Sequence, residues 1–508
     1  LNSDRSHINT STQIVDNETE RKQIDNEIQY KQLFKKKDRI LIATVRFGYV
    51  DDNQNSIIQT HTDFYKSNQV DSNDIADQQK IMNGHSRTIG SKISFSEPLN
   101  AKWAAVLEYA HNENASVSHK NTYDKDNSGK YSVIDNVYSN NFDLDVYSNS
   151  GTAILRYTTQ KLRAAFGSGI SNVKLKLYNL DSNRRNNYDF LNLTPQGSIS
   201  YSWKAQTRLT FNYRGTTRQP TIDQLQPIRD NQDRLNIFIG NPDLKVGFNH
   251  NMNAYFSTYK MLSQKGFYLS LNYNIPINAI TFLNSVDITN GQQTYKPINV
   301  NGNRNWNVYT YYYKDGSSKK WSYFIYANAS GGINNNYINQ ISNGVIQNVK
   351  NQTNYTYSNL SYSLRYFEAD KLNLEFGPQA GYNASKSSVQ KNLSSNYWNY
   401  GGRFSGTITI AKKFEFSTDG NFDLRQQLDA FKANPNQIIL NASLSRKVFK
   451  DNSGKIYILA QDILDQRKGF NRNISNNFIS EDRYSRLSRY FLLKFEWSFN
   501  KMPGQPTK

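Results

Sequence analysis

The chain has no cysteine among its 508 residues, which excludes disulfide frameworks, iron–sulfur clusters and thiol catalysis. It also lacks any run approaching the roughly 18 apolar residues that a membrane-spanning helix needs. No phosphate-binding loop, dinucleotide fingerprint, zinc motif or nucleophile elbow occurs, so the sequence predicts no enzyme. The chain opens on Leu-Asn-Ser-Asp, without an initiator methionine or a signal peptide, and we expect a processed or truncated form.

Hydrophobic residues are few, at 37 % of the chain, and the mean hydropathy of −0.76 accompanies a net charge of +19. Low hydrophobicity with high net charge is typical of disordered chains. The aromatic residues argue against disorder, since 35 tyrosines, 27 phenylalanines and 6 tryptophans are far too many for a solvated chain. A polar average with many aromatics is typical of a membrane β-barrel, where lipid contacts one face of each strand and water the other.

Apolar and polar residues alternate with a period of two along much of the chain. The final segment shows this clearly, with Phe491, Leu493, Phe495, Trp497 and Phe499 on one face and Leu492, Lys494, Glu496 and Ser498 on the other. The same pattern occurs near residues 41–49, 209–214, 267–274, 372–376 and 438–445. Charged residues such as Arg46, Arg214 and Glu375 lie on the polar faces. Burial of these charges in a dry core would cost free energy, whereas a water-filled lumen would keep them hydrated.

Short polar turns alternate with longer polar stretches, as in bacterial barrels with short periplasmic turns and long extracellular loops. Short turns are expected at residues 35–38, 98–101, 160–161, 204–206, 260–265, 315–319, 368–371, 412–413 and 451–454. Long stretches are expected at residues 51–80, 121–140, 217–246, 286–303, 337–347, 387–394, 429–435 and 465–484, with a shorter link at 181–186. A soluble β-solenoid or tandem sandwiches are the alternative, but no fixed repeat length supports a solenoid.

These segments predict an all-β protein, a large antiparallel transmembrane β-barrel of about nineteen visible strands. Residues 1–20 are expected to form a polar tail or loop, residues 21–500 the barrel, and residues 501–508 a short periplasmic tail. Single-chain bacterial barrels have even strand numbers, and the first segment runs towards the short turns. An odd count that starts in this direction indicates that the beginning of the barrel is missing.

The most distinctive motif lies at residues 213–251. It reads Tyr-Arg-Gly-Thr-Thr-Arg-Gln-Pro-Thr-Ile-Asp-Gln-Leu-Gln-Pro, then Ile-Gly-Asn-Pro-Asp-Leu-Lys, and ends on Asn-His-Asn. Further matches are Phe-Lys-Lys-Lys-Asp-Arg-Ile-Leu from Phe34 and the ending Arg-Tyr-Phe-Leu-Leu-Lys-Phe-Glu-Trp-Ser-Phe-Asn-Lys from Arg489. With these motifs, the whole chain resembles Bacteroidetes TonB-dependent receptors of the outer-membrane β-barrel family.

The resemblance implies a 22-stranded barrel filled by an N-terminal plug that carries a TonB box. Neither plug nor box is visible, so the chain would fit a family barrel lacking its plug and first three strands. The implied location is the outer membrane of a Gram-negative bacterium. The implied partners are outer-membrane lipid and lipopolysaccharide, the barrel assembly machinery, the TonB system through a plug outside this chain, and a surface lipoprotein or other outer-membrane subunits.

The loop at residues 217–246 is the first candidate site. Binding residues concentrate on long loops of a rigid scaffold, and this loop carries Arg218, Asp223, Gln224, Arg229, Asp230 and Arg234. The alternative is a structural hairpin whose turns are set by Pro220, Pro227, Gly240 and Pro242. A motif shared by receptors with different ligands favours the structural alternative.

A calcium-binding loop is the second candidate site. Its oxygen donors, at positions one, three, five and twelve of the loop, are Asp124, Asp126, Ser128 and Asp135. Gly129 occupies position six, as such a loop requires. Lys125 and Lys130 are unhelpful charges and no flanking helices are expected, so an ordinary polar loop is the favoured alternative. Apart from Ca²⁺, no cofactor is expected.

Three aromatic residues near the C-terminus, Phe495, Trp497 and Phe499, resemble the signal by which barrels are recognised for outer-membrane insertion; alternatively, these rings simply face lipid. The histidines at positions 7, 61, 85, 111, 119 and 250 show no metal-ligand spacing. The charge is spread along the chain without a basic–aromatic module, so nucleic acid is not an expected partner. The positive charge is better explained by lysines in the periplasmic turns that face anionic lipid headgroups, and by basic residues in the lumen or loops that attract anionic solutes.

Transport is the leading functional hypothesis: a receptor barrel for uptake of a scarce solute, such as a siderophore, metal complex, peptide or glycan, with TonB dependence implied by the resemblance. The rival is a structural or scaffolding barrel, a subunit of a larger outer-membrane complex without transport activity, which the absence of a plug motivates. A barrel hydrolase is a third possibility, but no serine–histidine constellation supports it.

Overall fold

The computed structural model describes residues 8–225, 235–287, 292–318, 320–342, 345–389, 395–427, 436–449, 452–467, 469–474 and 479–498. Regular structure in these ranges is almost entirely β-strand, and α1 (Ile222–Leu225) is a single helical turn. Within the same ranges no helix has the length and apolar character needed to cross a membrane. The expected all-β fold is confirmed.

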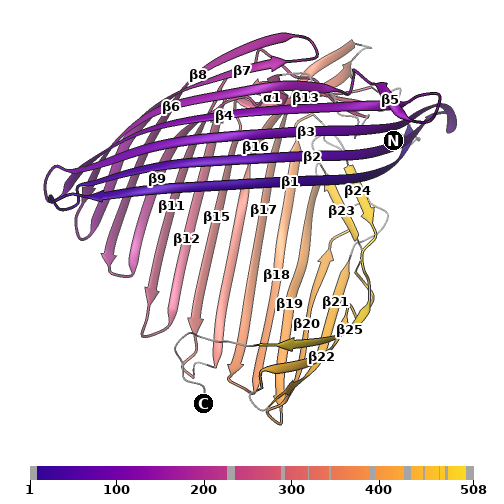
Figure 1. Ribbon diagram of the computed structural model, residues 1–508. Helices are drawn as coiled ribbons and strands as arrows, with labels where there is room; N and C mark the ends of the chain where they lie inside the picture. Colours follow the sequence, from indigo (N-terminus) through magenta and orange to yellow (C-terminus); the bar gives the residue numbers. More distant parts are fainter. Residues whose placement is uncertain are drawn as a thin grey trace.

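The wall of the molecule is one curved antiparallel sheet in which successive long strands pair with each other (Figure 1). In spatial order the wall strands are β1 (Asn9–Leu33), β2 (Ile40–Lys66), β3 (Gln69–Pro98), β4 (Trp103–Lys125), β6 (Asn140–Thr158), β7 (Leu162–Asn179), β8 (Arg184–Lys204), β9 (Thr207–Arg218), β11 (Gly247–Lys260), β12 (Lys265–Ile277), β15 (Arg304–Asp315), β16 (Trp321–Ser342), β17 (Val345–Glu368), β18 (Leu372–Ser387), β19 (Ser395–Ile410), β20 (Phe414–Arg425), β21 (Gln437–Val448), β22 (Gly454–Gln461) and β25 (Tyr490–Trp497). These nineteen wall strands confirm the number expected from the sequence.

Shorter strands lie in the long connections at the opposite rim from the short turns. They are β5 (Tyr131–Ile134), β10 (Asn236–Phe238), β13 (Ala279–Val286), β14 (Gln293–Val300), β23 (Gly469–Ile474) and β24 (Ile479–Tyr484). The β13–β14 hairpin extends the wall at this rim, because β13 pairs with the upper part of β16 and β14 pairs with β10. β23 and β24 form a separate two-stranded sheet.

β1 and β25 form the two edges of the described sheet, since β1 pairs with β2 and β25 pairs with β22. Both edge strands run towards the short turns, so they are parallel to each other. An antiparallel closure between them therefore requires an odd number of further strands. The expectation that three such strands complete a 22-stranded barrel stays a prediction.

Every expected short turn separates two consecutive wall strands, all at the same rim. Ala411 and Lys412, between β19 and β20, have φ angles of 49° and 61°, a pair of left-handed conformations that suits the tight turn of an antiparallel hairpin. The short-turn rim is therefore the periplasmic rim of the wall.

Several segments that were expected to be loops or a tail are strands. β1 begins at Asn9 rather than at Arg21, and β2 and β3 continue to a turn at Ser67 and Asn68 through the expected loop at 51–80. Parts of the expected loops at 121–140, 286–303, 337–347 and 465–484 are also strands. One face of the β2 and β3 extensions is buried, but largely by polar residues such as Ser56, Thr60 and Gln78, so apolar and polar residues do not alternate there and the sequence pattern misses them.

The expected lipid-facing residues lie on one face of the wall and are exposed. Phe47, Leu209, Phe376 and Leu493 have exposed fractions of 41 %, 42 %, 53 % and 78 %. A soluble domain would not leave so continuous a surface of large apolar side chains in water. This surface is the outer face of a transmembrane barrel, and the opposite, polar face lines the lumen.

The polarity of the two faces reverses part-way along the long strands, as β7 shows. Near the periplasmic rim, Phe166 and Ile170 point outward and are exposed. Farther up the same strand Lys174 is exposed on the outer face, whereas Leu175 and Leu177 are buried on the inner face. The reversal lies between Ile170 and Lys174 and marks the upper limit of the apolar band, because a lysine cannot remain in hydrocarbon without a large cost.

Tryptophans mark both limits of this band. Trp103, Trp203 and Trp321 each lie at or next to the strand end at a short turn. Higher up, Trp306 is paired with Gly331 in the register of β15 and β16. Between residues 321 and 331 of β16 there are about ten residue steps, which at a strand tilt of about 45° span roughly 24 Å, the height expected of an outer-membrane apolar band.

We predict that arginine on the outer face destabilises the wall and that arginine on the inner face does not. Ile199→Arg places a charge in lipid and should lower the free energy of unfolding by about 2–4 kcal/mol. The adjacent inner position provides the control, since Ser198→Arg should change it by less than about 1 kcal/mol. Urea unfolding of the protein in lipid vesicles measures both; equal effects would contradict the assignment of the faces.

Candidate binding surfaces of the lumen

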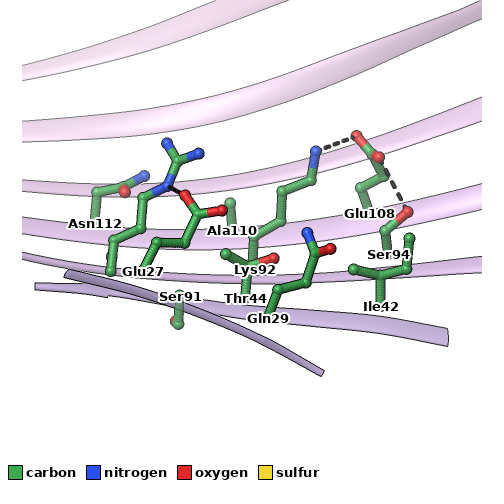
Figure 2. Close-up of a pocket in the computed structure, with 12 residues that line it drawn as sticks. Glu27, Gln29, Ile42, Thr44, Ser91, Lys92, Ser94, Glu108, Ala110 and Asn112 are labelled. Atoms are coloured by element: carbon green, nitrogen blue, oxygen red, sulfur yellow. Dashed lines mark hydrogen bonds and ion pairs between the residues drawn. The ribbon is translucent and has the colours of Figure 1, made fainter. Parts of the chain in front are cut away.

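Charged side chains on the inner face of β1–β4 form one polar cluster near the periplasmic half of the wall. Glu27, Arg46, Lys92 and Glu108 come from four consecutive strands and point to the same side of the sheet in register. Figure 2 shows Glu27, Lys92 and Glu108 extending from the strands into a shared hollow of about 450 Å³. The expected polar lumen is thus lined by organised charges.

Ion pairs neutralise this cluster. Arg46 donates to Glu27 across β1 and β2, and Lys92 Nζ lies 3.1 Å from Glu108 Oε2 across β3 and β4. Ser94 Oγ donates to the other oxygen of Glu108 over 3.1 Å. These side chains remain accessible to water, so each pair contributes at most about 1 kcal/mol to stability. Their arrangement therefore matters more for the electrostatic potential of the lumen than for folding.

A second inner hollow, of about 630 Å³, lies over β16–β20. Arg403 donates to Glu375 Oε1 through Nε at 3.1 Å and Nη2 at 2.9 Å, and Ser363 Oγ donates to the same oxygen at 3.1 Å. The sequence indicated Arg46 and Glu375 as lumenal, but not their partners Glu27 and Arg403. Glu27 and Arg403 could have been found in the sequence by the criterion that identified Arg46 and Glu375, a charged residue at a polar position of a strand with alternating polarity.

The described parts of the 217–246 loop fold onto the wall at the upper rim. Thr221 and Gln224 form one half of a capping box around α1, because the Thr221 backbone N–H donates to Gln224 Oε1 at 3.0 Å. Leu225 and Leu244 are buried, and Val246 packs against the inner-face cluster of Val173, Leu175 and Phe190. Gln224 thus has a structural contact.

The remaining candidate residues of that loop are only partly described. Arg218 is the last residue of β9 and is exposed. Nothing is described of the Asp223 side chain, and Arg229, Asp230 and Arg234 lie outside the described residues. A ligand-binding role for these residues stays a prediction.

The expected calcium ligands lie from the end of β4, which includes Asp124, to the turn that follows β5, and each takes part in hydrogen bonds. Gln78 Nε2 donates to both Asp124 Oδ1 and Asp135 Oδ2 over 2.9 Å, so an amide bridges two of the expected carboxylates. Asp126 instead accepts from Ser128 Oγ at 2.6 Å and Ser132 Oγ at 2.5 Å within its own turn. In the described residues no group of three or more acidic, histidine or cysteine side chains is gathered for a metal. Calcium binding stays a prediction.

Hydrogen bonds also set the ionisation of Asp126. The hydroxyls of Ser128 and Ser132 and the backbone N–H of Lys130 all donate to its carboxylate and hold its pKa well below the usual range. A depressed pKa means that the stabilising contacts are present above the ordinary value and are lost as the pH falls through the folded-state value. Asp126 is therefore ionised throughout the neutral and mildly acidic range.

The expected insertion signal lies at an edge of the sheet. Phe495 and Trp497 are exposed on the outer face of β25, and the ring of Phe449 contacts both at centroid distances of 6.2 Å. Phe499 lies outside the described residues. The lipid-facing alternative suits the two described rings, and recognition by the assembly machinery stays a prediction.

Sequence comparison places this wall among known proteins. A model of the outer membrane protein beta-barrel family matches residues 32–358 and 330–497. The chain belongs to this family. It is an outer-membrane β-barrel protein, as its polarity indicates. No curated protein matches the chain in sequence.

The solved structures that are similar to this chain include receptors and an importer. The hemophore receptor HasR from Serratia marcescens, solved with its hemophore HasA and heme, aligns with a TM-score of 0.44 and 10 % identity, over 96 % of this chain and 71 % of HasR. The siderophore receptor PirA from Pseudomonas aeruginosa has a TM-score of 0.39 and 9 % identity, over 94 % and 80 % of the two chains. The RagAB peptide importer has a TM-score of 0.41 and 8 % identity, over 94 % and 75 %.

We predict that Glu108 influences charged solutes in the lumen. The chain has no cysteine, so Asn112→Cys, beside the hollow, gives a unique site for charged thiol reagents. Glu108→Gln removes a negative charge and should raise the labelling rate of an anionic reagent relative to a cationic one by a few-fold, equivalent to about 1 kcal/mol or less. Glu113→Gln, on the outer face of the same strand, should leave the ratio unchanged; an equal change in both variants would contradict the lumenal placement.

For the calcium loop, calorimetric titration of Ca²⁺ into the full chain should give a dissociation constant of about 10⁻⁴–10⁻³ M. Gln78→Glu should tighten binding, because a carboxylate then replaces the amide between Asp124 and Asp135, and Asp135→Asn should abolish it. Since the pKa of Asp126 is depressed, binding should persist from neutral pH to about pH 5. Absence of heat with the unaltered chain would show that these residues form an ordinary polar loop.

Proposed function

We propose that this chain forms the wall of an outer-membrane receptor that takes up a scarce solute into the periplasm. The observation that carries the proposal is the inner face, where polar hollows and paired charges line the concave side of a lipid-facing wall. A barrel that served only as a membrane anchor would not need charges ordered by ion pairs across four strands. Solute passage does need them, since polar groups along the path replace part of the hydration shell of the solute.

The upper rim also supports uptake. The 217–246 loop is tied to the β13–β14 hairpin, because Asn299 accepts from the Lys245 N–H at 2.7 Å and donates to the Lys245 carbonyl at 2.9 Å. Anchored loops at the outer mouth of a barrel can hold a ligand above the lumen. The resemblance to TonB-dependent receptors adds an energy source and a plug outside this chain, and the ligand could be a siderophore, metal complex, peptide or glycan.

Deletion of the gene in the source organism tests the proposal. The deletion strain should lose growth when iron, peptide or glycan is limiting, and loss of TonB should reproduce the same defect. The unaltered gene should restore growth, and so should Glu113→Gln, which changes only the outer face. Normal growth and uptake of every solute in the deletion strain would overturn the proposal.

A scaffolding barrel is the second candidate, and the long strands above the apolar band favour it. β2 and β3 continue to the turn at Ser67 and Asn68, and this hairpin could contact another outer-membrane subunit. This candidate predicts stoichiometric co-purification with outer-membrane proteins in mild detergent, together with unimpaired uptake in the deletion strain. If the chain is a receptor, the deletion strain should instead lose uptake of its solute.

A further inference from the structure

Three lysines form a row across neighbouring strands at the periplasmic rim of the wall. Lys260 is the last residue of β11, Lys265 is the first of β12, and Lys314 is the last but one of β15. The register places them directly beside one another. Lys265 shares its face of β12 with Phe267 and Leu271, which belong to the apolar outer set, so the three lysines lie on the outer face. We call them the lysine row.

The lysine row has no counter-charge within the described part of the chain. None of its three members forms an ion pair with a residue that the structure describes. Glu368, at the end of β17, is already paired with Lys320 at 3.3 Å and with Lys371 at 3.1 Å. Like charges that lie directly opposite each other in a sheet destabilise it. The row is therefore a place where an anion from outside the chain would relieve repulsion.

A hollow of about 600 Å³ adjoins the lysine row on the outer side of the rim. Its lining combines a cation with hydroxyl groups and phenol rings, from Lys314, Ser263, Ser317, Tyr312 and Tyr323. Asp315 also contributes to the lining, but its Oδ1 accepts a hydrogen bond from Ser322 Oγ at 2.7 Å, between residues paired on the inner face. The hollow thus offers hydrogen-bond donors beside an ammonium group.

The turn between β11 and β12 is fixed beside this hollow. The Asp315 N–H donates to the Gln264 carbonyl at 3.1 Å, and the Gln264 N–H donates to the Met261 carbonyl at 3.2 Å. Met261 is 64 % exposed and Leu262 is fully exposed. Exposure of such large apolar side chains to water costs free energy, whereas the glycerol and first methylene groups of a lipid would cover them. The lysine row therefore lies between this apolar turn and the apolar band.

A lipid phosphate matches this combination of groups. Ammonium and hydroxyl groups donate charge-assisted hydrogen bonds to phosphate, and long lysine side chains can reach the headgroup level from the end of a strand. A free phosphate would gain nothing from the rings and the apolar turn. A zwitterionic headgroup carries its own ammonium group, which competes with the lysines for the phosphate.

We propose that the lysine row and the adjoining hollow bind the headgroup of an anionic phospholipid in the periplasmic leaflet. The bound lipid would neutralise the three like charges and fix the height of β11, β12 and β15 in the membrane. This site lies outside the lumen. It goes beyond the proposed transport function and holds for a receptor and for a scaffolding barrel alike.

Lipid binding to the full chain in detergent tests the assignment. The probes are dilauroyl-phosphatidylglycerol, which is anionic, and dilauroyl-phosphatidylethanolamine, which is zwitterionic and has the same acyl chains. Native mass spectrometry counts the lipids bound at each concentration. Phosphatidylglycerol should bind at least about tenfold more tightly than phosphatidylethanolamine, because several lysines attract its uncompensated charge.

Paired substitutions locate the site. Lys265→Gln with Lys314→Gln should weaken phosphatidylglycerol binding about tenfold and leave phosphatidylethanolamine binding unchanged, whereas the two Lys→Arg changes should keep the affinity within about twofold. The matched control is Lys174→Gln with Lys176→Gln. It removes the same charge from the outer face of β7, where each lysine has an aspartate directly opposite, and should leave the affinity unchanged.

Equal affinity of the unaltered chain for the two lipids would overturn the proposal, and so would a Lys265→Gln, Lys314→Gln variant that keeps its preference or a control pair that loses as much. Displacement of phosphatidylglycerol by an excess of inorganic phosphate would show a free-anion site and reject the lipid. If the glutamine variant does not fold, added salt applied to the unaltered chain gives the same test, since screening should weaken only phosphatidylglycerol binding. A photo-crosslinker at position 262 that captures a polypeptide in cell envelopes, without any lipid preference of the purified chain, would assign the surface to a protein instead.

Discussion

Hydrogen bonding between neighbouring backbones is the constraint on which the whole molecule depends. Hydrocarbon offers no partner to a peptide N–H or C=O, so a lipid-facing sheet must satisfy each of them within the wall. The continuous pairing from β1 to β25 does this for the described strands. Because the backbone hydrogen bonds hold the wall together, the inward-facing side chains do not have to form a dry apolar core and can be polar. A chain with a mean hydropathy of −0.76 can therefore form a membrane protein.

The pleat of the sheet converts this constraint into function. Because successive side chains point to opposite faces, each strand can present lipid with one set of residues and water with the other. Ile199 faces outward while its neighbour Ser198 lies on the lumen side, and a shift of register by one residue would exchange them. The inner set can therefore vary from strand to strand without changing how the wall sits in the membrane.

Much of the fold could be predicted from the sequence because the membrane imposes a strict pattern on the strands inside it. The alternation around Phe47, Leu209 and Leu493 was sufficient to place those strands and their outward faces. It failed for residues 9–20 and for the upper parts of β2 and β3, where polar residues occupy both faces, even at buried positions such as Ser56 and Thr60. Strands outside the membrane are determined by pairing with distant segments, which a local pattern does not reveal.

The candidate sites were less predictable for the same reason. Spacing along the chain suggested Asp124 and Asp135 as metal ligands, but it gave no hint of Gln78, which comes from another strand and bridges them. Asn251, Asn274 and Asn305 likewise lie side by side only because of the register between β11, β12 and β15. A single asparagine in a strand carries no such information.

The turn at Ser67 and Asn68 has a consequence for the cell surface. Tyr49 is near the top of the apolar band, and the strand from there to Lys66 is about 55 Å long at the usual rise per residue. Even when tilted, this hairpin reaches well past the phosphate groups of the outer leaflet and into the saccharide layer. Its tip is thus accessible to antibodies and phages, and a short affinity tag inserted there would be displayed on intact bacteria.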